Sequence, residues 1–278
     1  MSLNGKYIVR FTRLNRVLHV FMIISFLILS LTGMSLKFSY TGWAKVLSKF
    51  FGGFESAGYW HRFAASIMII VFITHLVDLI RLRKKEFGSW KALLIGKNSM
   101  IFNKKDWQDF KNSLKWFIGK GTRPDYGRWT YWEKFDYFAV FWGMFVIGST
   151  GMTLWFPEFF TNFIPGWMIN VATIIHSDEA LLATGFIFTI HFFNTHLRPE
   201  KFPMDIVIFS GRVQLDEFRL DRPDEYNEMT GKGELEKNLV EQYPPIVLRG
   251  MKIFGWTALT IGFSIVIWII YAMIFAYR

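Results

Sequence analysis

Long apolar stretches alternate with short polar segments along this chain of 278 residues. A helix of about 20 apolar residues crosses a hydrocarbon layer roughly 30 Å thick. Five stretches reach that length, and they cover approximately residues 17–36, 59–82, 135–156, 174–197 and 251–277. The pattern predicts an all-α integral membrane protein, in which the first four stretches form a four-helix transmembrane bundle and the fifth adds one more transmembrane helix.

The polar segments divide the chain into four parts. We expect a cytoplasmic tail over residues 1–16, a four-helix membrane domain over residues 17–197, a cytoplasmic polar segment over residues 198–246, and the fifth transmembrane helix within residues 247–278. The first apolar stretch ends without a small-residue cleavage site, so we expect no cleaved signal peptide.

The basic residues indicate how the chain crosses the membrane. The net charge of +10 could suggest a nucleic-acid partner, but the lysines and arginines lie in loops beside the apolar stretches. They gather in residues 1–16 and 82–134, whereas the connection over residues 158–167 has none. Basic loops of membrane proteins stay on the cytoplasmic side, and this rule accounts for the positive charge of the chain. We therefore expect no nucleic-acid partner. We expect a bacterial-type cytoplasmic membrane protein with a cytoplasmic N-terminus and a periplasmic C-terminus.

The cytoplasmic loop over residues 83–134 contains one helical pattern, at Lys104–Lys120. Its apolar residues share one face and its lysines lie opposite; the apolar residues are Trp107, Phe110, Leu114, Phe117 and Ile118. This pattern predicts an amphipathic helix on the membrane surface, with Asn103 as its N-cap.

All six histidines lie in or at the ends of the apolar stretches; they are His19, His61, His75, His176, His191 and His196. In the second stretch His61 precedes His75 by 14 residues, a rise of about 21 Å along a helix. In the fourth stretch His176 precedes His191 by 15 residues, a rise of about 22 Å. Two histidine pairs therefore match in depth, His61 with His176 near the outer face and His75 with His191 near the inner face.

Each site offers two imidazoles, and the chain has no cysteine, which limits the kinds of metal group that could bind. The absence of cysteine excludes disulfides, iron–sulfur ligation and covalent c-type haem in this chain. Zinc would want further ligands, whereas haem iron takes four ligands from its porphyrin and needs only two more. We therefore expect two b haems. The additional His19 and His196 would allow a third haem, or serve proton transfer. On an α-helix His196 is turned about 140° from His191, so we expect the two not to share an iron.

Two other readings of the histidines remain. Each could simply join helices through hydrogen bonds. They could also line the path of a transporter or metal permease, although the helices of such a protein are commonly broken at mid-membrane. No proline lies between the paired histidines of either stretch.

A short repeat links the first and third stretches. LTGMSL closes the first at residues 31–36, and STGMTL closes the third at residues 149–154. The first histidine of the next stretch follows 28 residues after Gly33 and 25 residues after Gly151. The glycines, with Gly185, indicate either close helix packing or room for a flat macrocycle.

Several motifs carry a family resemblance. They are RLNRVLH at residues 13–19, with LTG after it, Trp60-His61, the TG that ends the third stretch, and HSDEA followed by HFFNTHLRPEKFPMD between residues 176 and 205. With these motifs the chain resembles the gamma subunit of membrane-bound formate dehydrogenases and the related hydrogenase b-type cytochromes, over most of residues 8–230. The histidine spacing is similar to that of the di-haem cytochrome b of bc complexes.

The resemblance implies a membrane-anchoring di-haem cytochrome b subunit of a hetero-oligomeric respiratory complex. Such a subunit passes electrons between a membrane quinone and an extracytoplasmic redox subunit. The quinone would be menaquinone or ubiquinone, and the redox subunit would be a multihaem cytochrome c or an iron–sulfur protein. Any substrate chemistry would then belong to the partners.

The two family patterns agree on the outer haem and differ on the inner one. Both carry outer ligation onto His61 and His176. The formate dehydrogenase pattern carries inner ligation onto His19 and His191, and the bc pattern carries it onto His75 and His191.

The resemblance also places a quinone site by the inner haem, at the start of the third stretch. There Trp129, Glu133 and Asp136 are the candidate residues. The two carboxylates could exchange the protons that accompany quinone chemistry, or they could simply be the solvated start of a helix.

Overall fold

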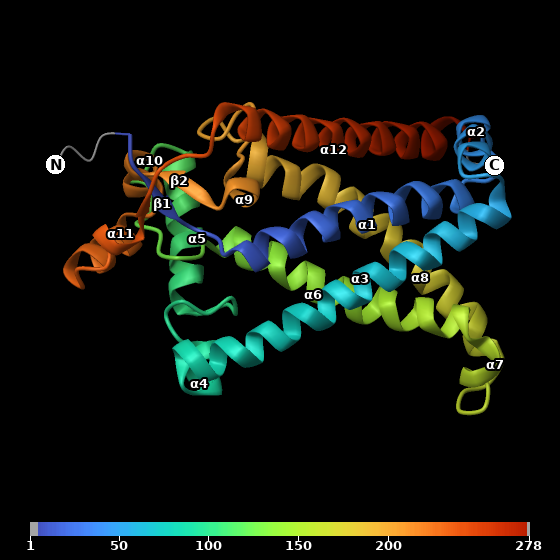
Figure 1. The fold of residues 1–278 in the computed structure, drawn as a ribbon. Helices are drawn as coiled ribbons and strands as arrows, with labels where there is room; N and C mark the ends of the chain where they lie inside the picture. The colour runs from blue at the N-terminus through green and yellow to red at the C-terminus, as the bar shows by residue number, and fades with distance from the viewer. Residues whose placement is uncertain (1–4, 277–278) are drawn as a thin grey trace. The chain divides into compact units, whose positions relative to one another are not determined.

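The computed structural model describes residues 5–276 and is built mainly of helices (Figure 1). The long ones are α1 (Arg13–Lys37), α3 (Phe54–Leu82), α6 (Tyr131–Trp155), α8 (Trp167–Phe186) and α12 (Pro245–Tyr271). Three of them continue in π-helical form; these extensions are η1 (Arg83–Phe87) after α3, η2 (Ile187–His191) and η3 (Phe193–Leu197) after α8, and η5 (Ala272–Ala276) after α12.

Within the described residues, five helices are long and apolar enough to cross a membrane, which confirms the predicted fold class. Each begins a few residues before the predicted stretch. Residues 1–4 of the expected tail and residue 277, where the expected fifth span ends, lie outside the described residues.

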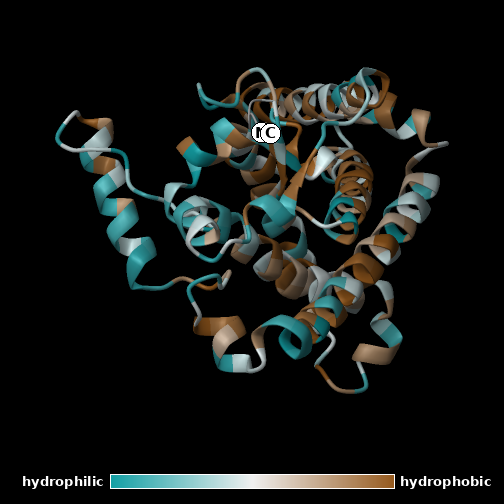
Figure 2. Cartoon of the chain, turned by 60° about the vertical axis from the view of Figure 1, so that its left-hand side comes forward, coloured by the Kyte–Doolittle hydropathy of each residue, from teal (hydrophilic) through white to brown (hydrophobic). Residues whose placement is uncertain are grey.

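Short elements fill the segments between the long helices. The helices are α2 (Gly42–Phe50), α4 (Trp90–Ile95), α5 (Lys104–Phe117), α7 (Pro157–Phe160), α9 (Val207–Ser210), α10 (Leu215–Asp221), α11 (Pro223–Gly231) and the 3-10 turn η4 (Glu236–Asn238). The strands are β1 (Tyr7–Val9), β2 (Arg212–Gln214) and β3 (Leu239–Val240). Figure 2 shows hydrophobic residues concentrated in the long helices and hydrophilic residues in the short helices and loops.

The chain forms two compact units. The first consists of residues 5–17, Leu76–Phe138 and Ile206–Met251. It holds a small antiparallel sheet of order β2-β1-β3, in which β1 pairs with both other strands. Its apolar core consists of Ile8, Val213, Leu215, Phe218 and Leu235. The segment Tyr7–Val9 is therefore held by strand pairing, which the hydropathy pattern does not predict.

The second unit consists of Leu18–His75, Ala139–Asp205 and residues 252–276. Its core includes Phe188, Leu259 and Ile265. A Cβ added at Gly262 of α12 would lie 2.5 Å from a ring carbon of Phe188. The backbone of α12 therefore approaches these aromatic rings more closely than any residue other than glycine permits.

Two capping boxes set where α5 and α6 begin. Asn103 accepts from the backbone of Asp106, whose side chain accepts from the backbone of Asn103, so the predicted N-cap is confirmed. At α6 the backbone N–H of Thr130 donates to Glu133 at 2.8 Å, and that of Glu133 donates to the Thr130 hydroxyl at 3.4 Å. Such reciprocal bonds satisfy donors that a helix start otherwise leaves unpaired.

Candidate functional site

The outer histidine pair lies inside the second unit. His61 on α3 and His176 on α8 place their ring centroids 6.2 Å apart, with ring planes at 74°. Two imidazoles that bind one metal from opposite sides, each at about 2 Å, have centroids about 6 Å apart. The two side chains therefore have the spacing that would be needed to hold a single haem iron between them.

His61 is held by the end of the first long helix. The Thr32 hydroxyl donates to the carbonyl of Ile28 at 2.6 Å, so its lone pairs are left to accept from Nδ1 of His61 at 3.0 Å. A Cβ at Gly33 would lie 3.2 Å from Cε1 of the same ring. With Nδ1 engaged, Nε2 is the nitrogen available to a metal.

His176 is held in the same way by the end of the third long helix. Its Nδ1 lies 3.0 Å from the carbonyl of Ile147 and 3.3 Å from the Thr150 hydroxyl, which donates to Val146. A Cβ at Gly151 would lie 2.9 Å from Cε1 of His176.

The Thr-Gly dipeptides of the sequence repeat thus make one contact twice, each holding a histidine of the next long helix. Both glycines provide room for a ring, and the ring is that of the histidine. Gly185 differs, since a Cβ there would meet nothing within 4 Å. Thr32 and Thr150 are functional candidates that we did not single out from the sequence, although the repeat was the signal that could have found them.

A second pair of histidine rings lies close together within the second unit. His19 on α1 and His191 at the end of η2 have ring centroids 6.5 Å apart, with planes at 50°. His75 on α3 places its ring 6.1 Å from that of Phe141. Among the described residues, no group of three or more His, Asp or Glu side chains could hold a metal ion by itself. Haem iron needs only two side chains, because its porphyrin supplies the other four ligands.

The helix around His191 is wound differently from the α-helix assumed in the prediction for His196. His196 was expected to turn about 140° away from His191, as it would on an α-helix. The chain is π-helical on both sides of Phe192, and π-helical hydrogen bonds run from i to i+5. Residues five apart then stack more nearly above one another.

Comparison with known families decides the class of protein. The model of the family described as prokaryotic cytochrome b561 matches residues 10–196. The chain belongs to the prokaryotic cytochrome b561 family. The matched segment includes all six histidines, whereas α12 lies beyond it. No curated protein matches the chain.

As a prokaryotic cytochrome b561, the chain is a multi-pass membrane protein that binds haem b and serves transmembrane electron transfer. Family membership thus favours the electron-carrier reading of the histidines over the transporter reading.

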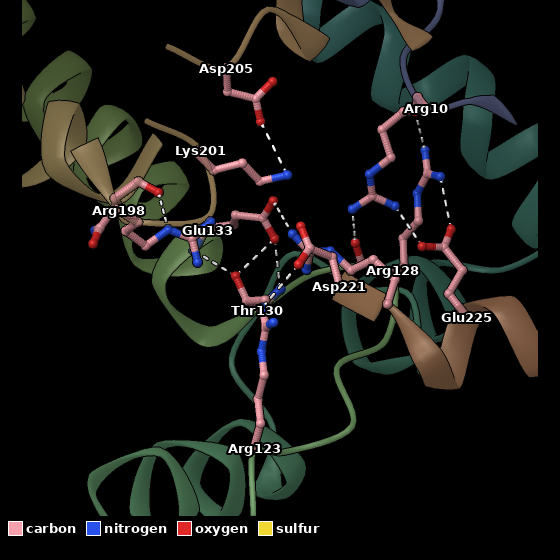
Figure 3. A network of polar contacts seen from close by, with 12 residues as sticks. Arg10, Arg123, Arg128, Thr130, Glu133, Arg198, Lys201, Asp205, Asp221 and Glu225 are labelled. Atoms are coloured by element: carbon pink, nitrogen blue, oxygen red, sulfur yellow. Dashed lines mark hydrogen bonds and ion pairs between the residues drawn. The ribbon is translucent and has the colours of Figure 1, made fainter. Parts of the chain in front are cut away.

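The candidate quinone residues of this cytochrome lie in the first unit. Glu133 accepts from the Thr130 hydroxyl at 2.8 Å (Figure 3). It also accepts from Arg222 at 2.8 Å. Its carboxylate is therefore held by the capping box and by an ion pair with Arg222, which lies between α10 and α11. Asp136, one turn later, is 9% exposed.

Trp129 lies close to two arginines, with the guanidinium of Arg10 5.1 Å and that of Arg128 5.2 Å from its ring. Both arginines bind Glu225, at 2.6 Å and 2.9 Å (Figure 3). Burial and the charge of Arg128 lower the pKa of Arg10, and Glu225 opposes that shift. This buried network contacts Trp129 directly, and sequence reasoning missed it because its members are far apart in the chain.

Proposed function

We propose that this cytochrome binds two b haems, an outer one through His61 and His176 and an inner one through His19 and His191. The facing imidazole pairs, at 6.2 Å and 6.5 Å between ring centroids, support the assignment. Depth along the helices favoured His75 as the partner of His191. The ring contact favours His19 instead. Each haem supplies a centre that gains and loses one electron.

The proposed sites lie at different depths. His176 and His191 are 15 residues apart on one continuous helical run, which corresponds to about 22 Å. Thr32 and His19 are 13 residues apart on α1, again about 20 Å. The two pairs would therefore carry electrons across most of the hydrocarbon layer.

We further propose that the inner haem exchanges electrons with menaquinone or ubiquinone at the start of α6, by Trp129, Glu133 and Asp136. On this assignment the N-terminus is cytoplasmic, because the basic residues of 82–134 lie on that side. The many contacts of Glu133 fit a residue that shapes this segment and orients its neighbours.

The outer haem would serve an extracytoplasmic redox subunit, either a multihaem cytochrome c or an iron–sulfur protein. Asp178, two residues after His176, keeps 67% of its side chain exposed while it binds Lys37 at 2.8 Å. An accessible carboxylate beside the outer pair supports docking of a partner there. This makes the chain one subunit of a hetero-oligomeric respiratory complex, in line with its resemblance to formate dehydrogenase gamma subunits.

Absorption spectra of histidine variants test the haem assignment. His61→Ala and His176→Ala should each remove the same haem, and His19→Ala and His191→Ala should each remove the other. Acidified acetone should extract all haem from the wild type, since no cysteine attaches it. A wild-type ratio below two haems per chain, or retention of both haems in His61→Ala, would refute the proposal.

Quinone-site inhibitors test the polarity. They should perturb the spectrum of the haem that the His191 variant loses, and Glu133→Gln should slow quinone turnover with both haems retained. A shift of the haem held by His61 would reverse the assignment of the two sides.

A further inference from the structure

The helix α5 buries its polar side. Asp106, Asp109 and Ser113 are at most 8% exposed. The Ser113 hydroxyl and the Tyr126 hydroxyl share a hydrogen bond of 2.7 Å, and Lys105 binds Asp109 at 2.9 Å. Burial raises the pKa of Asp109, and Lys105 opposes that shift. A helix that turns its acids and hydroxyls toward the protein must present its other side outward.

The outward side of α5 is apolar. Exposure is 61% at Trp107, 49% at Leu114 and 67% at Phe117, and Ile118 after the helix is 66% exposed. At about 100° per residue, these side chains and Phe110 occupy one continuous sector of roughly 100°.

A basic sector follows directly on the same helix. Lys111, Lys104 and Lys115 lie about 40° to 80° beyond Trp107, and all three are exposed. The order around α5 is therefore buried polar side, exposed apolar sector, exposed lysines. A water-facing helix would not expose the apolar sector, and a helix buried in protein would not place lysines at its edge.

Two contacts tie α5 to the start of a membrane span. Lys134 in the first turn of α6 binds Asp106 at 2.8 Å, with side chains only 2% and 5% exposed. The ring of Phe110 lies 5.5 Å from that of Tyr131, the first residue of α6. Since α6 spans the membrane, α5 is held at the level of the membrane surface.

We propose that α5 docks on the bilayer itself, with its apolar sector in the boundary between headgroups and acyl chains and its lysines on anionic phospholipid headgroups. The attachment to α6 and the adjacent lysine sector both favour a lipid surface. Interfacial helices of this kind insert about 5–10 Å. The surface involves no haem ligand, so the inference is independent of the proposed function.

The absence of cysteine from the chain makes the test direct. Leu114→Cys and Phe117→Cys would carry a spin label on the apolar sector, and Asn112→Cys would carry it on an exposed polar position of the same helix. The full chain is reconstituted in nanodiscs of phosphatidylglycerol and phosphatidylethanolamine, or of phosphatidylcholine alone. Collisions with oxygen and with a water-soluble nickel chelate report depth, and haem absorbance verifies folding.

Labels at positions 114 and 117 should collide with oxygen and be shielded from nickel, whereas the label at 112 should be open to nickel. Shielding should weaken in phosphatidylcholine. Replacing one lysine, as in Lys111→Gln or Lys115→Gln, should weaken the binding of α5 to the anionic bilayer about fivefold. The matched charge change Lys237→Gln, at an exposed position in η4, should have no effect. Nickel access at 114 and 117 equal to that at 112 would overturn the proposal. So would shielding seen only in native membranes, which would identify a protein partner instead.

Discussion

Gly151→Ala is the sharpest single test of how the outer site is built. The added Cβ would lie 2.9 Å from Cε1 of His176, and ordinary van der Waals contact begins at 3.4 Å. The ring must therefore move by about 0.5 Å, because the α6 backbone cannot yield easily. Metal–ligand distances tolerate about 0.2 Å. We expect haem affinity at the outer site to fall about 10–100-fold, the usual cost of disturbing the groups that orient a ligand.

Two further glycines give a graded series. Gly33→Ala places its Cβ 3.2 Å from the His61 ring, so a shift of about 0.2 Å suffices and the outer haem should stay bound. Gly148→Ala, one turn before Gly151 on the same helix, meets nothing within 4 Å and should change nothing. All three variants gain the same helix propensity, about 1 kcal/mol, so differences among them reflect contact with the histidines.

The assay is the reduced-minus-oxidised absorption spectrum combined with low-temperature electron paramagnetic resonance, which separates two haems with differently oriented imidazoles. The expected order of disturbance is Gly148 least, then Gly33, then Gly151, confined to the haem lost in His61→Ala. Loss of the inner haem in Gly151→Ala, or equal behaviour of the three variants, would show that the repeat does not position the outer ligands.

Three other outcomes follow from the same geometry. Thr32→Val should retain both haems and raise the outer haem potential by up to about 40 mV, since one lost hydrogen bond of about 1 kcal/mol makes the ligand less basic; an unchanged potential in redox titration would contradict this. His19→Ala should remove the inner haem while His75→Ala retains it, and the reverse pattern would restore the depth-based pairing. Lys134→Met should destabilise the chain by roughly 3–5 kcal/mol in thermal unfolding, because it leaves Asp106 buried without its cation; adding Asp106→Asn should recover part of the loss.

The long helices were predictable because twenty consecutive apolar residues have few alternatives in a protein of this composition. The histidine pair His61 and His176 was also predictable, because helix rise converts sequence spacing into depth. The cap of α5 at Asn103 followed from local chemistry alone. Each of these features depends on residues close together in the chain.

Features that depend on distant segments could not be found in this way. The strand Tyr7–Val9 pairs with residues more than 200 positions later, and its three residues carry no pattern of their own. Depth counting favoured His75 as the partner of His191, whereas the ring of His19 is the one that lies 6.5 Å from it, because rotation about each helix axis decides which ring reaches His191. The π-helical winding around His191 changes that rotation again, and hydropathy does not record it.

The outer and inner sites differ in the local structure that surrounds their histidines. At the outer site each histidine has a threonine and a glycine from another long helix against its ring, and the two arrangements repeat one another. At the inner site His191 and His196 lie in π-helical segments, a form of helix found frequently at functional sites. An outer pair in contact with neighbouring helices would suit exchange with a docked protein partner, which needs a fixed position. An inner site with histidines in π-helical segments would suit exchange with a small diffusing quinone, because the binding of quinone requires local adjustment of the protein. The division of labour proposed for the two haems thus matches the way in which the chain builds each site.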